Sequence, residues 1–136
     1  MTTPPDPRIA ELNAWLIDAT IRGQDHVDML DGYCHKLVEF DVPVTRVHAA
    51  HTALHPVYGA IAFQWNADAG SGQEAFARSD EPVPEWRNSP FYYMISQKKD
   101  TYRERMWQSN EPSRFPLLKE RRLQGATDYL AALVNF

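Results

Sequence analysis

Three histidines, His48, His51 and His55, are the densest cluster of metal-ligand side chains in the sequence. In a helix, His51 and His55 would lie one turn apart on one face, which is the spacing that histidine zinc sites use. In a strand, His51 and His55 again share a face, and His48 points to the other face. The segment offers no His-Glu-x-x-His pattern and no neighbouring carboxylate as a third ligand. We therefore expect ordinary packed or exposed histidines without a metal, and keep a small metal-dependent hydrolase as an alternative function.

Other groups that could make or break bonds lack a supporting pattern. Cys34 is the only cysteine, and it falls on the apolar side of a predicted helix, which favours a buried structural thiol over a nucleophile. The neighbouring acids Glu39 and Asp41 have no surroundings that predict the buried setting of an acid–base pair. Phosphate-binding loops, dinucleotide fingerprints and nucleophile elbows do not occur. The sequence therefore predicts no catalytic residues and no cofactor.

Aromatic side chains are the remaining candidates for contact with a ligand. They make up 12% of the residues, and Phe63 and Trp65 share one face of a predicted strand. Phe91 and Tyr92 lie in a predicted short helix. The same residue types line small-molecule pockets and ordinary cores, and core packing is the simpler interpretation. If the rings form a pocket, its predicted lining is His55, Phe63, Trp65, Phe91 and Tyr92.

Two helices are predicted to precede the strands. Asp6 is a suitable N-cap and Pro7 suits the first helical position, so residues 1–7 are expected to form a tail before the helix. Apolar residues then recur at helical spacing until Gly23, which favours an end there. A second helix is predicted from about residue 25 to residue 40, because Pro43 disfavours helix in the residue before it.

The rest of the chain alternates between strands, loops and short helices. Residues 44–55 and 58–66 are predicted to form an antiparallel hairpin, and residues 67–84 a loop with a short strand near 74–78. Ser89 is expected to cap a short helix. A strand over 101–107, a helix over 116–124 that ends at Gly125 and a strand over 129–134 follow. These elements predict an α+β fold, and 136 residues suit one domain.

Charge is distributed unevenly along the chain, whose net charge is −4. Residues 1–82 carry twelve acids and five bases, whereas residues 83–136 carry six acids and nine bases. A phosphate-binding face in the basic part is one interpretation, but acids interrupt the bases, and we expect a solvated surface. The overall charge favours neither nucleic acid nor a membrane surface as a partner. No apolar run approaches the ~20 residues of a membrane span, no signal peptide is recognisable, and a cytoplasmic location is expected.

Short strings along the chain occur together in the order known from one family. They are Pro43 with Arg46, then Thr52, Leu54, His55, Pro56 and Gly59, then Trp65, Ser89-Pro90-Phe91, Phe115-Pro116 with Leu118, and Gly125 with Thr127, Asp128 and Tyr129. This pattern resembles the N-terminal sensory region that precedes the catalytic domain in bacterial class III adenylate/guanylate cyclases. The resemblance covers roughly residues 10–136. Asp41-Val42 stands where a glycine usually precedes the proline.

The resemblance implies a GAF/PAS-like fold with two leading helices and an antiparallel sheet, as a single sensor domain over residues 8–136. It implies a non-catalytic regulatory module of a cyclic-nucleotide signalling protein, because the chain lacks segments for the cyclase's metal-binding aspartates. The implied partners are a small-molecule ligand and a cyclase catalytic domain in cis or in trans. The final strand lacks a following element to cover its edge, so we expect a domain that further chain or another chain completes.

The matched residues also have structural interpretations. His55 and Pro56 are expected to shape the hairpin, Arg46 to pair with a carboxylate such as Asp128, and Gly125, Thr127 and Asp128 to brace a turn. The amphipathic first helix and the unfinished sheet edge favour a homodimer. A dimerisation module without a ligand is therefore the second alternative function.

Overall fold

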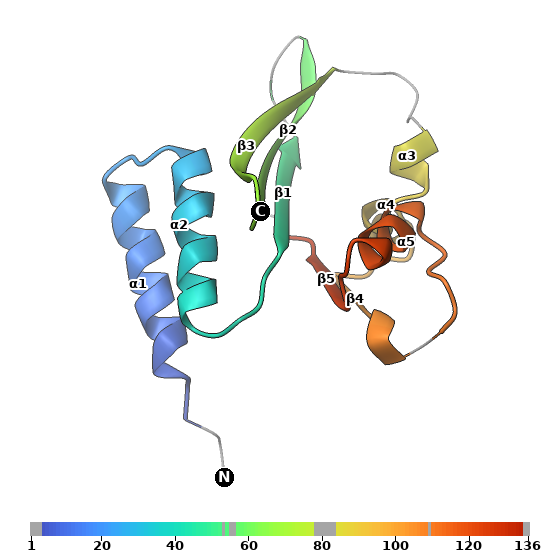
Figure 1. The fold of residues 1–136 in the computed structure, drawn as a ribbon. Helices are drawn as coiled ribbons and strands as arrows, with labels where there is room; N and C mark the ends of the chain where they lie inside the picture. The colour runs from blue at the N-terminus through green and yellow to red at the C-terminus, as the bar shows by residue number, and fades with distance from the viewer. Residues whose placement is uncertain (1–3, 53, 55–56, 78–83, 109, 135–136) are drawn as a thin grey trace. The chain divides into compact units, whose positions relative to one another are not determined.

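The computed structural model describes residues 4–52, 54, 57–77, 84–108 and 110–134 (Figure 1). The elements are α1 (Pro7–Ile21), α2 (His26–Glu39), β1 (Arg46–Thr52), β2 (Tyr58–Asn66), β3 (Gly70–Ala77), α3 (Pro84–Arg87), α4 (Pro90–Ser96), β4 (Thr101–Arg105), η1 (Met106–Gln108), α5 (Pro116–Leu123) and β5 (Asp128–Ala132). This confirms the α+β class. The contacts group into two compact units, unit 1 (Met1–Arg78) and unit 2 (Ser79–Phe136), where the sequence led us to expect one domain.

Helix α1 begins and ends where its sequence signals predict. The carboxylate of Asp6 accepts a hydrogen bond from the backbone N–H of Arg8, and Pro7 occupies the first turn. Gly23 follows the helix in a left-handed conformation, with φ of 70°. Leu12 and Ala19 are buried, but Ile9 is 58% exposed although it belongs to the predicted apolar stripe.

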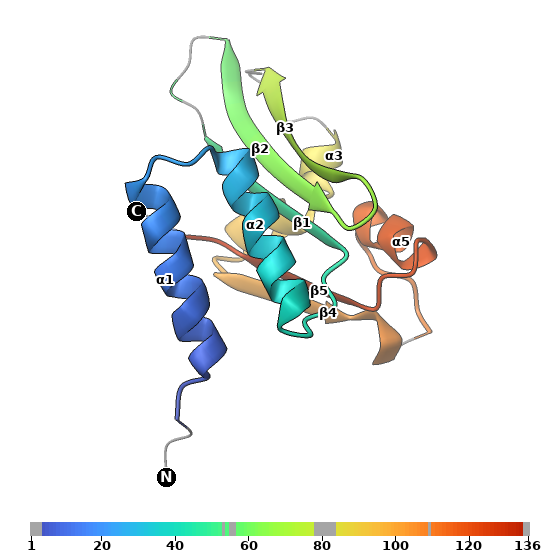
Figure 2. The same ribbon diagram turned by 60° about the vertical axis from the view of Figure 1, so that its left-hand side comes forward.

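Helices α1 and α2 lie side by side in opposite directions (Figures 1 and 2). The Arg8 guanidinium at the start of α1 donates a 2.9 Å hydrogen bond to the carbonyl of Phe40 at the end of α2. Midway along the pair, the indole of Trp15 packs on Gly32. A Cβ atom at Gly32 would lie 2.6 Å from the Trp15 ring, so this close approach of the helices requires glycine.

The sheet of unit 1 has three antiparallel strands in the order β1-β2-β3. The predicted hairpin is confirmed: β1 pairs with β2, with Arg46 opposite Asn66 and Thr52 opposite Ala60. The expected loop over residues 67–84 is wrong in extent, because residues 70–77 pair with β2 as a full strand. Backbone hydrogen bonds to β2 override the turn preference of Gly70 and Gly72.

Helix α2 covers one face of this sheet (Figure 2). The Asp25 carboxylate caps the helix by accepting a hydrogen bond from the backbone N–H of Val27. The ring of His26 contacts Phe63 edge-on, and the ring of His35 contacts Trp65 in the same way. Phe63 and Trp65 therefore share the face of β2 that the alternation predicts, and that face is turned toward α2.

Unit 2 contains a separate two-stranded sheet, in which β4 pairs antiparallel with β5. The strands of the described chain thus belong to two sheets. Ser89 caps α4 as predicted, and α5 ends just before Gly125, whose φ is 101°. Helix α3 was not predicted. Pro84, the last residue of the expected loop, occupies the first position of α3, where its missing N–H costs nothing.

The core of unit 2 is built around Leu118 of α5, which is fully buried. Its buried neighbours are Met106 and Phe115, and a ring of partly buried side chains packs on them: Tyr93, Tyr102, Ala126 and Tyr129. The ring centroids of Tyr102 and Phe115 lie 5.4 Å apart in edge-to-face contact. Such contacts add to the burial of the aromatic surfaces, so the core of this small unit depends mainly on aromatic side chains.

Candidate functional site

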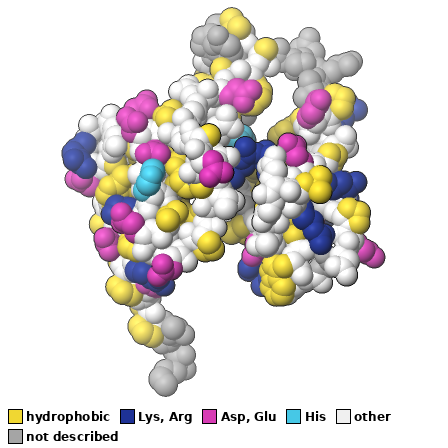
Figure 3. Space-filling model, viewed as in Figure 1, with side chains coloured by type: hydrophobic (Ala, Val, Ile, Leu, Met, Phe, Trp, Pro, Cys, Tyr) yellow, Lys and Arg dark blue, Asp and Glu magenta, His cyan; other side chains and the backbone are white. Residues whose placement is uncertain are grey.

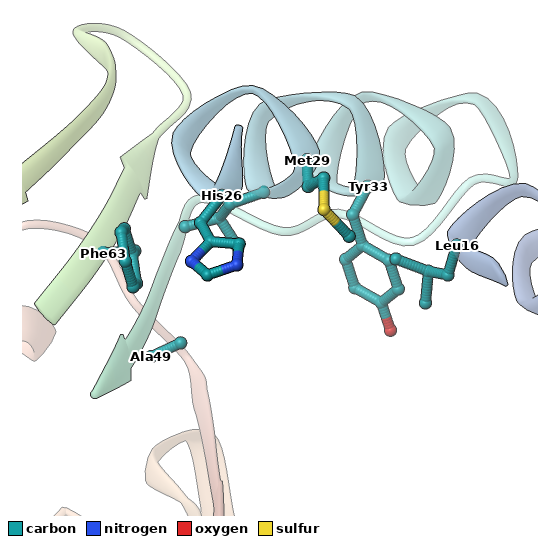
Figure 4. A pocket seen from close by; sticks show the side chains of 7 residues that line it. Leu16, His26, Met29, Tyr33, Ala49 and Phe63 are labelled. Atoms are coloured by element: carbon teal, nitrogen blue, oxygen red, sulfur yellow. The ribbon is translucent and has the colours of Figure 1, made fainter. Parts of the chain in front are cut away.

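A mainly apolar groove lies in unit 1. It has a volume of about 340 Å³ and lies between the two helices and the sheet. Its lining consists of Leu16 from α1, His26, Met29, Leu30 and Tyr33 from α2, Ala49 from β1 and Phe63 from β2. Figure 4 shows the side chains of Met29, Tyr33 and Leu16 reaching into the same space from the two helices.

Phe63, which lines the groove, contacts two histidines, of which His26 also lines it. The ring of His26 stands at 90° to it with centroids 5.3 Å apart, and the ring of His51 stacks on it at 6.0 Å. Nδ1 of His51 lies 2.9 Å from the carbonyl of Thr52, which holds this ring in place. One aromatic side chain is thus fixed by α2 from one side and by β1 from the other. Aromatic rings in such edge-on and offset contacts stabilise each other beyond their burial.

Two polar side chains converge on an otherwise apolar lining. The imidazole of His26 lies beside Phe63, and the hydroxyl of Tyr33 points away from α2 into the open part of the groove (Figure 4). An imidazole both donates and accepts hydrogen bonds, and so does a phenol. The groove can therefore hold an apolar body and orient one polar end of it.

The five predicted pocket residues are not brought together in one described pocket. Phe63 lines the groove, whereas Trp65 is only 4% exposed and forms part of the core beneath α2. Nε1 of Trp65 is a buried donor without an acceptor in the described part of the chain, which costs about 1–3 kcal/mol. Phe91 and Tyr92 belong to unit 2, where the ring of Tyr92 contacts that of Trp86. His55 lies outside the described residues.

The residues of α2 that line the groove were missed in the sequence analysis. His26, Met29, Leu30 and Tyr33 recur at spacings of three and four, the signal of one helix face. This face adjoins the apolar stripe through Cys34, and the polar atoms of His26 and Tyr33 obscure its apolar character. The mixed stripe on this helix indicates one wall of a groove, but not the α1, β1 and β2 residues that complete it.

The histidines of β1 are placed as the strand interpretation predicts, since His51 shares the face of Phe63. Within the described residues, which omit His55, no three His, Cys, Asp or Glu side chains stand close enough to hold a metal ion. The metal-dependent hydrolase therefore receives no support from the geometry of His48 and His51.

Asp128 has a different partner from the one expected. Its carboxylate accepts two hydrogen bonds from the guanidinium of Arg103, at 3.2 and 2.7 Å, across β4 and β5. This pairing lowers the pKa of Asp128 and raises that of Arg103. Arg103 is the diagonal neighbour of Asp128 in the sheet, since Arg105 stands directly opposite Asp128. The pairing of Arg46 with a carboxylate stays a prediction.

The other matched residues have structural surroundings. Gly125 ends α5 as predicted. The carbonyl of Thr127 accepts a hydrogen bond from the backbone N–H of Trp107, which ties the turn before β5 to η1. Arg46 begins β1 opposite Asn66. Pro56 lies outside the described residues.

Cys34 is fully buried in α2, and burial, reinforced by the nearby charge of Asp31, raises the pKa of its thiol from 9.0 to about 11. We expect alkylation of the native thiol at neutral pH to be at least about 100-fold slower than in urea-unfolded protein, because both the thiolate population and access fall. The measurement is the rate of iodoacetamide labelling by mass spectrometry. Native labelling within tenfold of the unfolded rate would contradict the buried placement.

No described helix is long and apolar enough to cross a membrane. No protein-family model, no curated protein and no solved structure matches this chain.

Proposed function

We propose that this chain is a non-catalytic sensor module whose groove in unit 1 binds a small, mainly apolar molecule. The observation that carries the proposal is the open groove of about 340 Å³ that α1, α2 and the sheet line. Small-ligand pockets commonly span about 300–1,000 Å³ and combine an apolar lining with a few polar groups. His26 and Tyr33 supply those groups, so the ligand has an apolar body and one hydrogen-bonding end.

The position of the groove supports a regulatory role. Helix α2 contacts α1 on one side and β2 and β3 on the other, so it forms a wall of the groove and a layer of the fold. A molecule bound there favours one packing of α2 over others. Ligand binding then shifts the population of helix arrangements, which is how a sensor domain passes a signal onward.

The resemblance of the sequence strings supports a more specific context. Under this proposal, the two helices and the antiparallel sheet of unit 1 belong to a GAF/PAS-like sensor domain of a cyclic-nucleotide signalling protein. Its output partner is a cyclase catalytic domain, in cis or in trans, and the module works as a homodimer in the cytoplasm. Reading the gene beyond the codon for Phe136 tests this context, since a cyclase domain would follow in the cis case.

Filling the groove from the sheet side should weaken ligand binding. Ala49 lines the groove opposite Phe63 in the β1–β2 register. We expect Ala49→Leu to weaken binding of the uncharged apolar dye Nile red about tenfold, because its added carbons occupy the ligand volume. Dye fluorescence measures the affinity, and a thermal-shift screen with small apolar acids and amides extends the test to other ligands.

The matched control is Ala50→Leu. Ala50 is the next residue in β1, is exposed, and points to the opposite face of the strand. This variant should bind Nile red as the parent does. Equal weakening in both variants would show that the dye binds elsewhere, and a well-folded protein that no screened compound stabilises would contradict ligand sensing.

One observation favours the alternative of a dimerisation module without a ligand. Ile9, Ile17 and Ile21 of α1 are 58%, 61% and 79% exposed, and they lie within one side of the helix. A second copy of the chain that docks there would remove apolar surface from water. Light scattering and the ligand screen together distinguish the alternatives. Dimers that dissociate on Ile17→Lys in a protein that binds no screened ligand favour this role, whereas strictly monomeric protein at micromolar concentrations excludes it.

A further inference from the structure

Tyr93, in α4 of unit 2, has two cationic neighbours. The Lys99 ammonium donates a 3.1 Å hydrogen bond to Oη of Tyr93 and lies 5.1 Å from the ring centroid. The guanidinium carbon of Arg114 lies 4.0 Å from the centroid of the same ring. Two positive charges from different segments are thus held against one neutral phenol.

These two charges have no carboxylate partner among the described residues. The ion pairs recorded for described residues of unit 2 join Arg103 to Asp128 and Arg121 to Glu120. No described carboxylate oxygen lies within 4.0 Å of the charged nitrogens of Lys99 or Arg114. Like charges gathered around one ring repel each other, and a bound anion would relieve that repulsion.

The ammonium of Lys99, the guanidinium of Arg114 and the hydroxyl of Tyr93 can each donate a hydrogen bond to a ligand. An ammonium carries three N–H groups and a guanidinium five, and neither can accept. The Tyr93 oxygen accepts from Lys99 in the described structure, so its own O–H remains able to donate. A ligand that satisfies the three side chains must therefore supply acceptors only.

The electrostatic environment of the phenol agrees with this geometry. The hydrogen bond from Lys99, followed by the effect of Arg114, lowers the pKa of Tyr93 below its usual value of 10.0. Tyr93 is partly exposed, and Lys99 and Arg114 are exposed, so a dissolved ligand can reach all three. On the face seen in Figure 3, Lys and Arg side chains gather over unit 2.

A small hollow adjoins this cluster through Arg114. It has a volume of about 180 Å³, and its lining includes two further bases, Arg105 and Arg122, and two acids, Glu104 and Glu111. Oε1 of Glu104 accepts hydrogen bonds from the hydroxyls of Tyr102, at 2.7 Å, and Ser113, at 3.0 Å. Because these bonds already stabilise the carboxylate, the hollow leaves room beside Arg114 for the organic part of an anionic ligand.

We propose that Tyr93, Lys99 and Arg114 bind the phosphate group of inorganic phosphate or of a small phosphate monoester. A phosphate monoester carries close to two negative charges at neutral pH and has three strong acceptor oxygens. Two cations match the charge, and the ammonium, guanidinium and phenol match the three oxygens. This site is independent of the apolar groove and goes beyond the sensing role proposed for unit 1.

The test is titration of the full chain with inorganic phosphate, followed by calorimetry or by amide chemical shifts. We expect Lys99→Gln to weaken phosphate binding about tenfold, since it removes a charge-assisted hydrogen bond. Tyr93→Phe removes one neutral donor and should weaken binding about threefold. Lys119→Gln is the matched control, because it removes the same charge from an exposed position on α5 and should change the affinity less than twofold.

Two further arms define the ligand. Glycerol phosphate should bind at least as tightly as inorganic phosphate if the neighbouring hollow holds the organic part, and the reverse order would assign the site to the free ion. Acetate should bind more weakly than either, because it carries one charge. The ionisation of Tyr93 can be followed by phenolate absorbance during titration with alkali. Its midpoint should shift to higher pH when phosphate binds and in Lys99→Gln.

Three results would overturn the proposal. The first is the absence of saturable binding at millimolar phosphate. The second is equal weakening in Lys99→Gln and Lys119→Gln, which would reduce the effect to general surface charge. The third is a single-stranded oligonucleotide that binds more tightly than either phosphate and in a manner that depends on Lys99, which would replace the ligand class.

Discussion

Leu118→Ala should destabilise unit 2 by about 3 kcal/mol. Leu118 is fully buried and is surrounded by Met106, Phe115 and a ring of aromatic side chains. The substitution removes buried apolar groups and leaves a cavity that rigid rings close poorly, and such changes cost about 2–5 kcal/mol. Urea denaturation, followed by tryptophan fluorescence, measures the change in the free energy of unfolding.

The same helix offers the control for this substitution. Leu123, the last residue of α5, is 89% exposed, so Leu123→Ala removes the same atoms from a position in water. Its expected effect is within about 0.5 kcal/mol of the parent. Similar losses in Leu118→Ala and Leu123→Ala would mean that α5 does not pack as described.

Gly32→Val should destabilise the α1–α2 pair by about 2 kcal/mol, within the range for overpacking. The Cβ atom of the new side chain would stand 2.6 Å from one carbon of the Trp15 ring and 2.7 Å from another. Valine is a better helix former than glycine by a few tenths of a kcal/mol, so the expected loss is net of that gain. Thermal unfolding monitored by circular dichroism is the measurement.

Two variants isolate the cause in Gly32→Val. Gly72→Val makes the same change in β3, where no atom lies within 4 Å of the added Cβ and where β-branched residues are favoured, so stability should hold or rise. Adding Trp15→Leu to Gly32→Val should recover part of the lost stability, because the smaller side chain vacates the contact. If Trp15→Leu recovered no stability, the loss in Gly32→Val would have a cause other than the contact between residue 32 and Trp15.

Local signals in the sequence predicted much of unit 1. Asp6 and Asp25 cap their helices, Gly23 and Pro43 mark the ends, and the alternation through Phe63 places the aromatic face of β2. Caps, turn residues and side-chain periodicity act within a few residues. A single sequence therefore carries them without reference to the rest of the chain.

Features that depend on distant residues were missed. Residues 70–77 form a strand because β2 supplies their hydrogen-bond partners, and no local pattern in a glycine-containing segment announces that pairing. The partner of Asp128 is Arg103, 25 residues away, and it is adjacent only because β4 and β5 align in one register. The groove depends in the same way on α1, α2 and two strands together.

The hydrogen bond from Arg8 to the Phe40 carbonyl ties the start of α1 to the end of α2, at the end of the helix pair opposite to the groove. Arg8 also forms an ion pair with Asp6, the N-cap of α1, at 2.7 Å. Residues 6–8 therefore connect the N-terminal end of α1 with the C-terminal end of α2. A protein shortened to begin at Ala10 would lose the hydrogen bond to Phe40 but would keep the packing of Trp15 on Gly32. Its helices would be free to separate at that end, while the short connection over residues 22–25 would still hold them together beside the groove residues Leu16 and His26.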